Sequence, residues 1–148
     1  MPSVFSKLNL KDQNPIVVLN FPDSFEAELK SLKGIEVIKD VKKAKALTFS
    51  LAFVTTHQQV DTLAPALGRK AEGDAVVWLA YPKKTSKKYQ SEISRDSGGW
   101  GAMGKEGFEP VRLVAIDEDW SAVRFRRATF IKNMTRPEEY RLTGKGKK

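Results

Sequence analysis

The side chains that could do chemistry gather where predicted strands end. Polar and aromatic residues follow several apolar runs, most prominently in Tyr81-Pro-Lys-Lys84 and in the Asp117–Trp120 turn. In an open α/β sheet, ligands bind beyond the carboxyl ends of the strands. We therefore predict a ligand site from these positions and from a Gly- and Trp-containing turn between them. Its members are Asn20, Tyr81, Lys83, Lys84, Arg95, Trp100, Asp117 and Trp120.

Patterns for catalysis are scarce. His57 is the single histidine, and a histidine can act as a general base near neutral pH. A lone histidine at a helix start more often caps the helix or lies at the surface, and we favour that interpretation. The chain has no G-x-S-x-G elbow, and Lys83–Ser86 resembles a phosphate loop only in composition because it lacks glycines. We therefore favour a protein that is not an enzyme.

Composition excludes several classes of site. With no cysteine and one histidine, the chain can form neither a disulfide nor a thiolate or multi-histidine metal site, and we predict no metal and no cofactor. The 148 residues contain no run of 18 apolar residues, and Met1–Leu8 lacks the apolar run of a signal peptide. We therefore expect a cytoplasmic protein.

The net charge is concentrated at the end of the chain. Lys132–Lys148 holds six basic and two acidic residues, a net charge of +4, which is half of the +8 of the whole chain. A basic tail can hold nucleic acid loosely, but a solvated tail that aids solubility is the commoner case. We predict one α/β domain over residues 1–131, with an N-terminal arm over 1–14 and a flexible basic tail over 132–148.

Short apolar runs alternate with helical patterns along the chain. The runs predict strands over 16–19, 35–38, 47–54 and 75–81, and a closing antiparallel hairpin over 111–116 and 122–125. The predicted helices run from an Asp23 or Ser24 cap to Gly34, from a Thr56 cap to Gly68, and, as a short helix, between Asp96 and Gly107. This order predicts a three-layer α/β domain with a mostly parallel sheet.

Details of these elements give further expectations. Small residues alternate with large ones over 47–54, which indicates a sheet face in contact with a closely packed helix. Pro65 lies inside the second helix and removes one backbone donor, so we expect a kink or an early end there. Trp78 is mid-strand and should be core. Trp100 and Trp120 lie beside turns, where they are either exposed binding anchors or buried under the hairpin.

Two stretches resemble known families. Leu67–Leu79, in which a helix ends, a glycine turn follows and an apolar strand begins, resembles Rossmann-like methyltransferases, and Gly107–Arg126 looks like the closing hairpin of that fold. This resemblance implies the strand order 2-1-3-4-6-5, with a ligand crevice between strands one and three. The Tyr81-Pro-Lys, Gly107-Phe108 and Asp119-Trp120 motifs are more similar to small bacterial proteins catalogued as domain of unknown function 3052, a resemblance that implies no activity for this chain.

The loop after the first strand departs from the methyltransferase pattern. Methyltransferases place glycines there, because only glycine lets the backbone approach the cofactor, whereas this chain has Asn20-Phe-Pro-Asp-Ser-Phe25. We therefore favour a non-catalytic Rossmann-like domain that binds a small anionic ligand or a protein partner. The alternatives are a divergent S-adenosylmethionine-dependent methyltransferase and a nucleic-acid-binding accessory protein, the latter because Lys83–Tyr89 and Arg124–Arg127 place cations beside aromatic residues.

Overall fold

A six-stranded sheet forms the centre of the molecule. The computed structural model describes residues 4–11, 13–32, 34–83, 86–87 and 100–128. The strands are β1 (Ile16–Leu19), β2 (Val37–Ile38), β3 (Leu47–Phe53), β4 (Ala71–Pro82), β5 (Phe108–Ala115) and β6 (Trp120–Arg127). Their order across the sheet is β2-β1-β3-β4-β6-β5, which confirms the predicted topology. The first four strands are mutually parallel, and β6 runs antiparallel to both β4 and β5.

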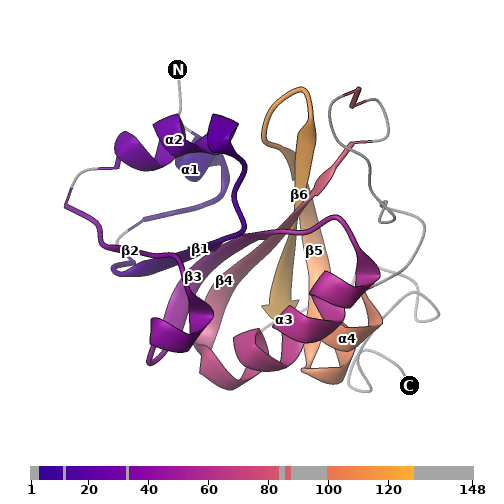
Figure 1. Cartoon of the computed structure of the whole chain (residues 1–148). Helices are drawn as coiled ribbons and strands as arrows, with labels where there is room; N and C mark the ends of the chain where they lie inside the picture. Colours follow the sequence, from indigo (N-terminus) through magenta and orange to yellow (C-terminus); the bar gives the residue numbers. More distant parts are fainter. Residues whose placement is uncertain (1–3, 12, 33, 84–85, 88–99, 129–148) are drawn as a thin grey trace.

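Helices cover both faces of the sheet, as Figure 1 shows. They are α1 (Val4–Lys7), α2 (Glu26–Lys30), α3 (His57–Lys70) and α4 (Gly101–Lys105), with short 3-10 turns η1 (Asp23–Phe25) and η2 (Val41–Lys43). One core cluster joins α3 and α4 to one face of the sheet, and a second cluster joins α1 and α2 to the other. The predicted three-layer α/β class is therefore confirmed.

The two faces have different packing partners because side chains alternate along a strand. On β3, Ala52 belongs to the same core cluster as the buried Val60 and Ala64 of α3. Phe49 and Phe53 face the other way, toward α1 and α2. The buried Ala52 thus belongs to the face that α3 covers, while close packing of α3 on the small residues of β3 stays a prediction, and Thr48 at the start of the strand is exposed.

The N-terminal arm forms part of the core. Phe5 and Leu8 are buried, and the indole nitrogen of Trp78 donates to the carbonyl of Leu8 over 2.8 Å. Trp78 itself is fully buried, so its assignment to the core is confirmed. A buried indole N–H needs an acceptor, and the arm supplies it.

The first predicted helix is shorter than expected. The chain passes through η1 into α2, which ends at Lys30 rather than near Gly34. Neither Asp23 nor Ser24 caps it: Pro22 precedes η1 and makes no side-chain cap. The predicted cap is therefore wrong. Residues 23–34 contain only four apolar side chains, so the segment has little apolar surface to bury. Packing of the buried Phe25 and Leu29 therefore decides the length of the helix.

The second predicted helix is confirmed and runs further than expected. Thr56 Oγ1 accepts from the backbone N–H of Gln59, and the Gln59 side chain bonds back to Thr56, which completes a capping box. The helix continues through Pro65 to Lys70, so the expectation of an early end is wrong. Buried Val60, Ala64 and Leu67 hold this stripe against the sheet, which outweighs the one missing hydrogen bond.

The closing hairpin is confirmed and is longer than predicted, because β5 begins at Phe108 and β6 extends to Arg127. The third predicted helix corresponds to α4, whereas Asp96 lies outside the described residues. The predicted basic tail, 132–148, also lies outside them. In the described part of the chain, no helix has both the length and the apolar character needed to cross a membrane.

Candidate functional site

The loop after β1 is filled by an aromatic side chain. Asn20 adopts a left-handed conformation, with φ of 58°, and its side chain is exposed. Phe21 follows it, half-buried against the core cluster that α1 and α2 cover. The ammonium of Lys39, just after β2, lies 5.5 Å from the centroid of the Phe21 ring. Phe21 and Lys39 thus occupy the space beyond the carboxyl ends of β1 and β2.

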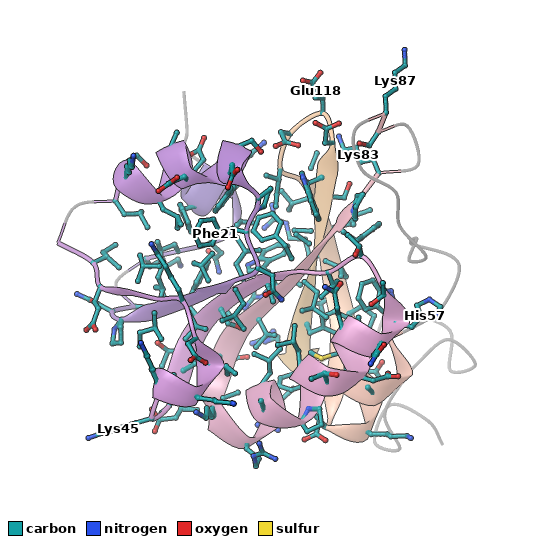
Figure 2. All side chains as sticks on the ribbon, viewed as in Figure 1. Phe21, Lys45, His57, Lys83, Lys87 and Glu118 are labelled. Carbon is teal, nitrogen blue, oxygen red and sulfur yellow. The ribbon has the colours of Figure 1, made fainter. Side chains whose placement is uncertain are left out.

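The end of β3 is committed to starting α3. The side-chain carbonyl of Gln59 accepts from the backbone N–H groups of Thr55, over 2.6 Å, and of Thr56, over 3.2 Å. His57 is the first residue of α3 and is half-buried. It is labelled in Figure 2, where it points away from the sheet. The threonines here therefore stabilise a helix end, and the position of His57 at a helix start is confirmed.

A groove runs between α3 and α4 on the helical layer. It has a volume of about 520 Å³ and is lined by His57, Asp61, Pro65, Gly101, Ala102, Lys105 and Glu106. The lining from α3 repeats every four residues, which is the spacing of one helix face. Of the predicted site residues, only His57 lines it. The sequence carried the signal in this spacing, but without the position of α4 the second wall could not be inferred.

Two aromatic residues of the predicted ligand site are core residues. Tyr81 and Trp100 are 5% and 7% exposed, and their rings meet edge to face with centroids 5.8 Å apart. The Trp100 ring also meets Phe125, with centroids 5.4 Å apart. Of the two placements that the sequence left open for Trp100, the structure shows the buried one. Its position leaves little surface for a ligand.

The turn between β5 and β6 is organised by its own carboxylates. Asp117 Oδ1 accepts from the backbone N–H groups of Asp119, over 2.8 Å, and of Trp120, over 2.9 Å. Trp120 is 4% exposed and packs edge to face on Phe53 at 5.0 Å. The sequence left both placements open for Trp120 as well, and it is buried. Asp117 is exposed but already has two donors in the turn.

The loop after β4 is attached to this turn. The backbone N–H of Lys83 donates to the carbonyl of Asp119, and the Ser86 hydroxyl donates to the Asp119 carboxylate, both over 2.8 Å. Figure 2 shows the side chains of Lys83 and Lys87 at the same end of the molecule as Glu118. Lys84 and Arg95 lie outside the described residues. This edge of the sheet therefore carries cations on the loop after β4 and an acid on the neighbouring turn.

The structure therefore brings some of the predicted residues together and separates others. Lys83, Asp117 and Trp120 come from neighbouring segments at one end of the sheet, and Asn20 ends β1 at the same carboxyl edge. Tyr81 and Trp100 form a buried pair on the face that α3 and α4 cover. A ligand role for these residues stays a prediction. Across the described ranges, no three metal-ligating side chains cluster.

The comparisons with known proteins support the fold. No protein-family model and no curated protein sequence matches the chain, so the resemblance to domain of unknown function 3052 stays a prediction. Solved structures do match. A SAM-dependent methyltransferase from Aquifex aeolicus shares 15% identity at a TM-score of 0.54, and covers 84% of this chain and 88% of its own. The magnesium protoporphyrin IX methyltransferase of Synechocystis PCC 6803 shares 10% identity at a TM-score of 0.53, over 84% of this chain and 74% of its own.

A third match is phosphoethanolamine N-methyltransferase 2 of Haemonchus contortus, with 13% identity and a TM-score of 0.52, over 95% of this chain and 40% of that one. At these identities the likeness establishes a methyltransferase-like Rossmann fold. It leaves the activity open, and the residues at the cofactor position must be tested on their own.

The loop after β1 does not fit S-adenosylmethionine. Residues 20–25 contain no glycine, and Phe21 and Pro22 stand where backbone would have to approach the cofactor. An acidic residue about 20 positions further on binds the ribose in related nucleotide sites. Asp40 has this spacing, but its carboxylate accepts from the backbone N–H of Lys42 over 3.0 Å. The glycine-free loop therefore departs from the expected cofactor contact, whereas Asp40 keeps the spacing of the ribose-binding acid and already accepts one backbone hydrogen bond.

Proposed function

We propose that the chain is a non-catalytic binding domain with a methyltransferase-like fold, which takes a small anionic ligand at the carboxyl ends of its strands. The filled loop after β1 carries this proposal. With Phe21 half-buried against the core and Lys39 over its ring, this glycine-free loop offers no cradle of backbone amides for a nucleotide-like cofactor. Lys39 after β2 and Lys83 after β4 place cations at the same edge of the sheet, and these charges favour a ligand of negative charge.

Lys83 is the residue that best fits this role. Its side chain is half-buried and makes no hydrogen bond or ion pair within the described part of the chain. Its backbone is fixed by Asp119, so the ammonium is presented from a defined position. Lys45 offers a matched control, because it is an exposed lysine just before β3, at the opposite end of the sheet (Figure 2).

The test is an NMR titration of the full chain with citrate as the probe. We expect the amide signals of Asn20 and Lys83 to move, Lys83→Ala to abolish the shifts and Lys45→Ala to leave them unchanged. Equal loss in both variants would contradict a site at this edge. A protein partner is the alternative occupant, and an affinity pull-down in which only Lys83→Ala loses a bound protein would favour it.

A second candidate is a divergent S-adenosylmethionine-dependent methyltransferase. The match to three methyltransferase structures at TM-scores from 0.52 to 0.54 favours it. Calorimetry with millimolar S-adenosylmethionine separates the two candidates. Absence of heat of binding supports the first candidate. One-to-one binding, together with turnover that is lost in His57→Ala, would establish the second and remove the first.

A further inference from the structure

Three arginines share one face at the far end of the closing hairpin. Arg112 on β5 and Arg124 on β6 are register partners, so they stand directly opposite each other across the two strands. Arg126 lies two residues beyond Arg124 and therefore points to the same side. The register partner of Arg124 on β4 is Trp78, which belongs to the core cluster that α1 and α2 cover. The three arginines therefore lie on the face opposite α3 and α4.

Few acids balance these charges. Asp74 on β4 accepts from Arg126 at both carboxylate oxygens, from Nε over 2.8 and 3.0 Å and from an amino group over 2.6 Å. The side chains of Arg126 and Asp74 are about one-third exposed, at 35% and 34%. Glu109 is the register partner of Arg126 and is a second acid on this face, with a side chain that is 1% exposed. Arg112 is exposed and has no hydrogen bond or ion pair within the described residues.

Arg124 has an unmet hydrogen-bonding group. Its Nε is buried and has no hydrogen-bond partner among the residues that the structure describes. Burial lowers the pKa of Arg124, Asp74 acts in the opposite direction, and Arg126 and Arg112 lower the pKa further. A buried donor without an acceptor is costly, and like charges directly opposite on a sheet destabilise it. An anion bound beside the guanidinium groups offsets the repulsion between these like charges.

We propose that Arg112, Arg124 and Arg126 form a binding site for a phosphate group. The planar forks of guanidinium groups match the oxygens of phosphate in a bidentate manner. Arg112 is exposed and Arg124 and Arg126 are half-buried, so the phosphate of a small molecule and a phosphate of a nucleic-acid backbone can both approach from the side of Arg112. It is independent of the site at the carboxyl edge, because Lys83 and Arg126 belong to opposite ends of the β4–β6 pair.

Binding is tested on the full chain with two probes, inorganic pyrophosphate and a short single-stranded oligothymidylate, at low salt. Arginine side-chain NMR follows the Nε–H signal of Arg124, which should move on binding. We expect Arg112→Gln and Arg124→Gln each to weaken binding about ten-fold or more, as loss of a charge-assisted contact does. Arg69→Gln is the control, because Arg69 is an exposed arginine on α3, which covers the other face of the sheet.

Asp74→Asn gives a readout that a merely structural role would not produce. It removes a negative charge from the face and releases the fork of Arg126, so we expect it to tighten binding several-fold. The probes separate the two sources of phosphate. Tight pyrophosphate binding indicates a small ligand, whereas oligothymidylate binding that falls steeply with salt, without pyrophosphate binding, indicates nucleic acid.

Two results would overturn the proposal. One is that neither probe binds at low salt while the signal of Arg124 stays in place. The other is that Arg69→Gln weakens binding as much as Arg124→Gln, which would assign the effect to the overall positive charge. Circular dichroism of each variant shows that it is folded before its affinity is compared.

Discussion

Arg124 and Arg127 lie three residues apart on β6 and point to opposite faces of the sheet. Arg127 is surrounded by acceptors: it donates to the carbonyls of Gly68 over 2.6 Å and of Glu106 over 3.1 Å, and its guanidinium lies 4.8 Å from the centroid of the Phe108 ring. Arg124 has a buried Nε donor without a partner in the described part of the chain, and its neighbours carry the same charge. The same side chain thus stabilises the fold on one face and carries unused binding capacity on the other.

The difference follows from what covers each face. The ends of α3 and α4 leave carbonyls without intrahelical partners, and these carbonyls bring acceptors toward Arg127. Arg124 lies on the side of α1 and α2. Among the described residues, neither helix supplies a hydrogen-bond acceptor to its Nε. Charge alone therefore says little about the role of an arginine, and its partners decide it.

The largest effect expected from this comparison is on Arg127. Arg127→Ala leaves carbonyls of two helix ends without a donor, so we expect the free energy of unfolding to fall by about 2–3 kcal/mol. Urea denaturation followed by circular dichroism measures it. Arg127→Lys keeps the charge but loses the fork, and it should fall between the wild type and Arg127→Ala. A loss below about 0.5 kcal/mol in Arg127→Ala would contradict the structural role.

A second strong effect is expected where α3 meets the turn after α4. A Cβ built at Gly68 would lie 2.2 Å from Glu106 Oε1 and 2.9 Å from Glu106 Cβ. Gly68→Ala should therefore destabilise by about 1–3 kcal/mol, although alanine normally stabilises a helix by about 1 kcal/mol. Glu106→Ala is the matched partner: it removes the carboxylate but keeps the Cβ, so the double variant should recover part of the loss in thermal unfolding. No recovery would show that the contact with the carboxylate does not cause the loss.

The sequence predicted the sheet well because its strands are short apolar runs with few alternatives. It could not predict how far α3 continues past Pro65, since this depends on contacts of Leu67 with the sheet. It also placed Trp100 and Trp120 only beside turns, because burial of a tryptophan near a turn depends on which element folds over it. The lack of glycine in residues 20–25 could be read directly from the sequence, because it does not depend on how the rest of the chain folds.

The predicted ligand site was harder because it relied on conspicuous residue types. Tyr81 and Trp100 are conspicuous and buried, whereas Arg112 and Arg124 became notable only through their register on two strands. Register depends on the bulge between Pro110 and Arg112, which shifts the pairing. A shift of one residue moves every following side chain to the other face. The site on the arginine-bearing face could therefore not be derived from the sequence.

A smaller effect is expected at Asp74. Asp74→Asn removes a bidentate ion pair that is about one-third exposed, so we expect a loss of up to about 1 kcal/mol, most of it at low salt. Chemical denaturation in urea at low and high sodium chloride measures the difference. Salt should shrink the gap between variant and wild type, because it screens exposed charges. A gap that is equally large at high salt would show that Asp74 acts through packing.

The smallest effect on stability, and the sharpest contrast with Arg127, is expected at Arg124. Arg124→Gln removes a charge that faces Arg112 and replaces a buried Nε donor, while it keeps part of the aliphatic stem. We therefore expect a change within about 0.5 kcal/mol, or a slight gain, in urea denaturation without phosphate. A saturating phosphate ligand should then stabilise the wild type but not the variant, because a ligand that binds only the folded state raises its stability. A loss above 1.5 kcal/mol without ligand would mean that Arg124, like Arg127, belongs to the fold.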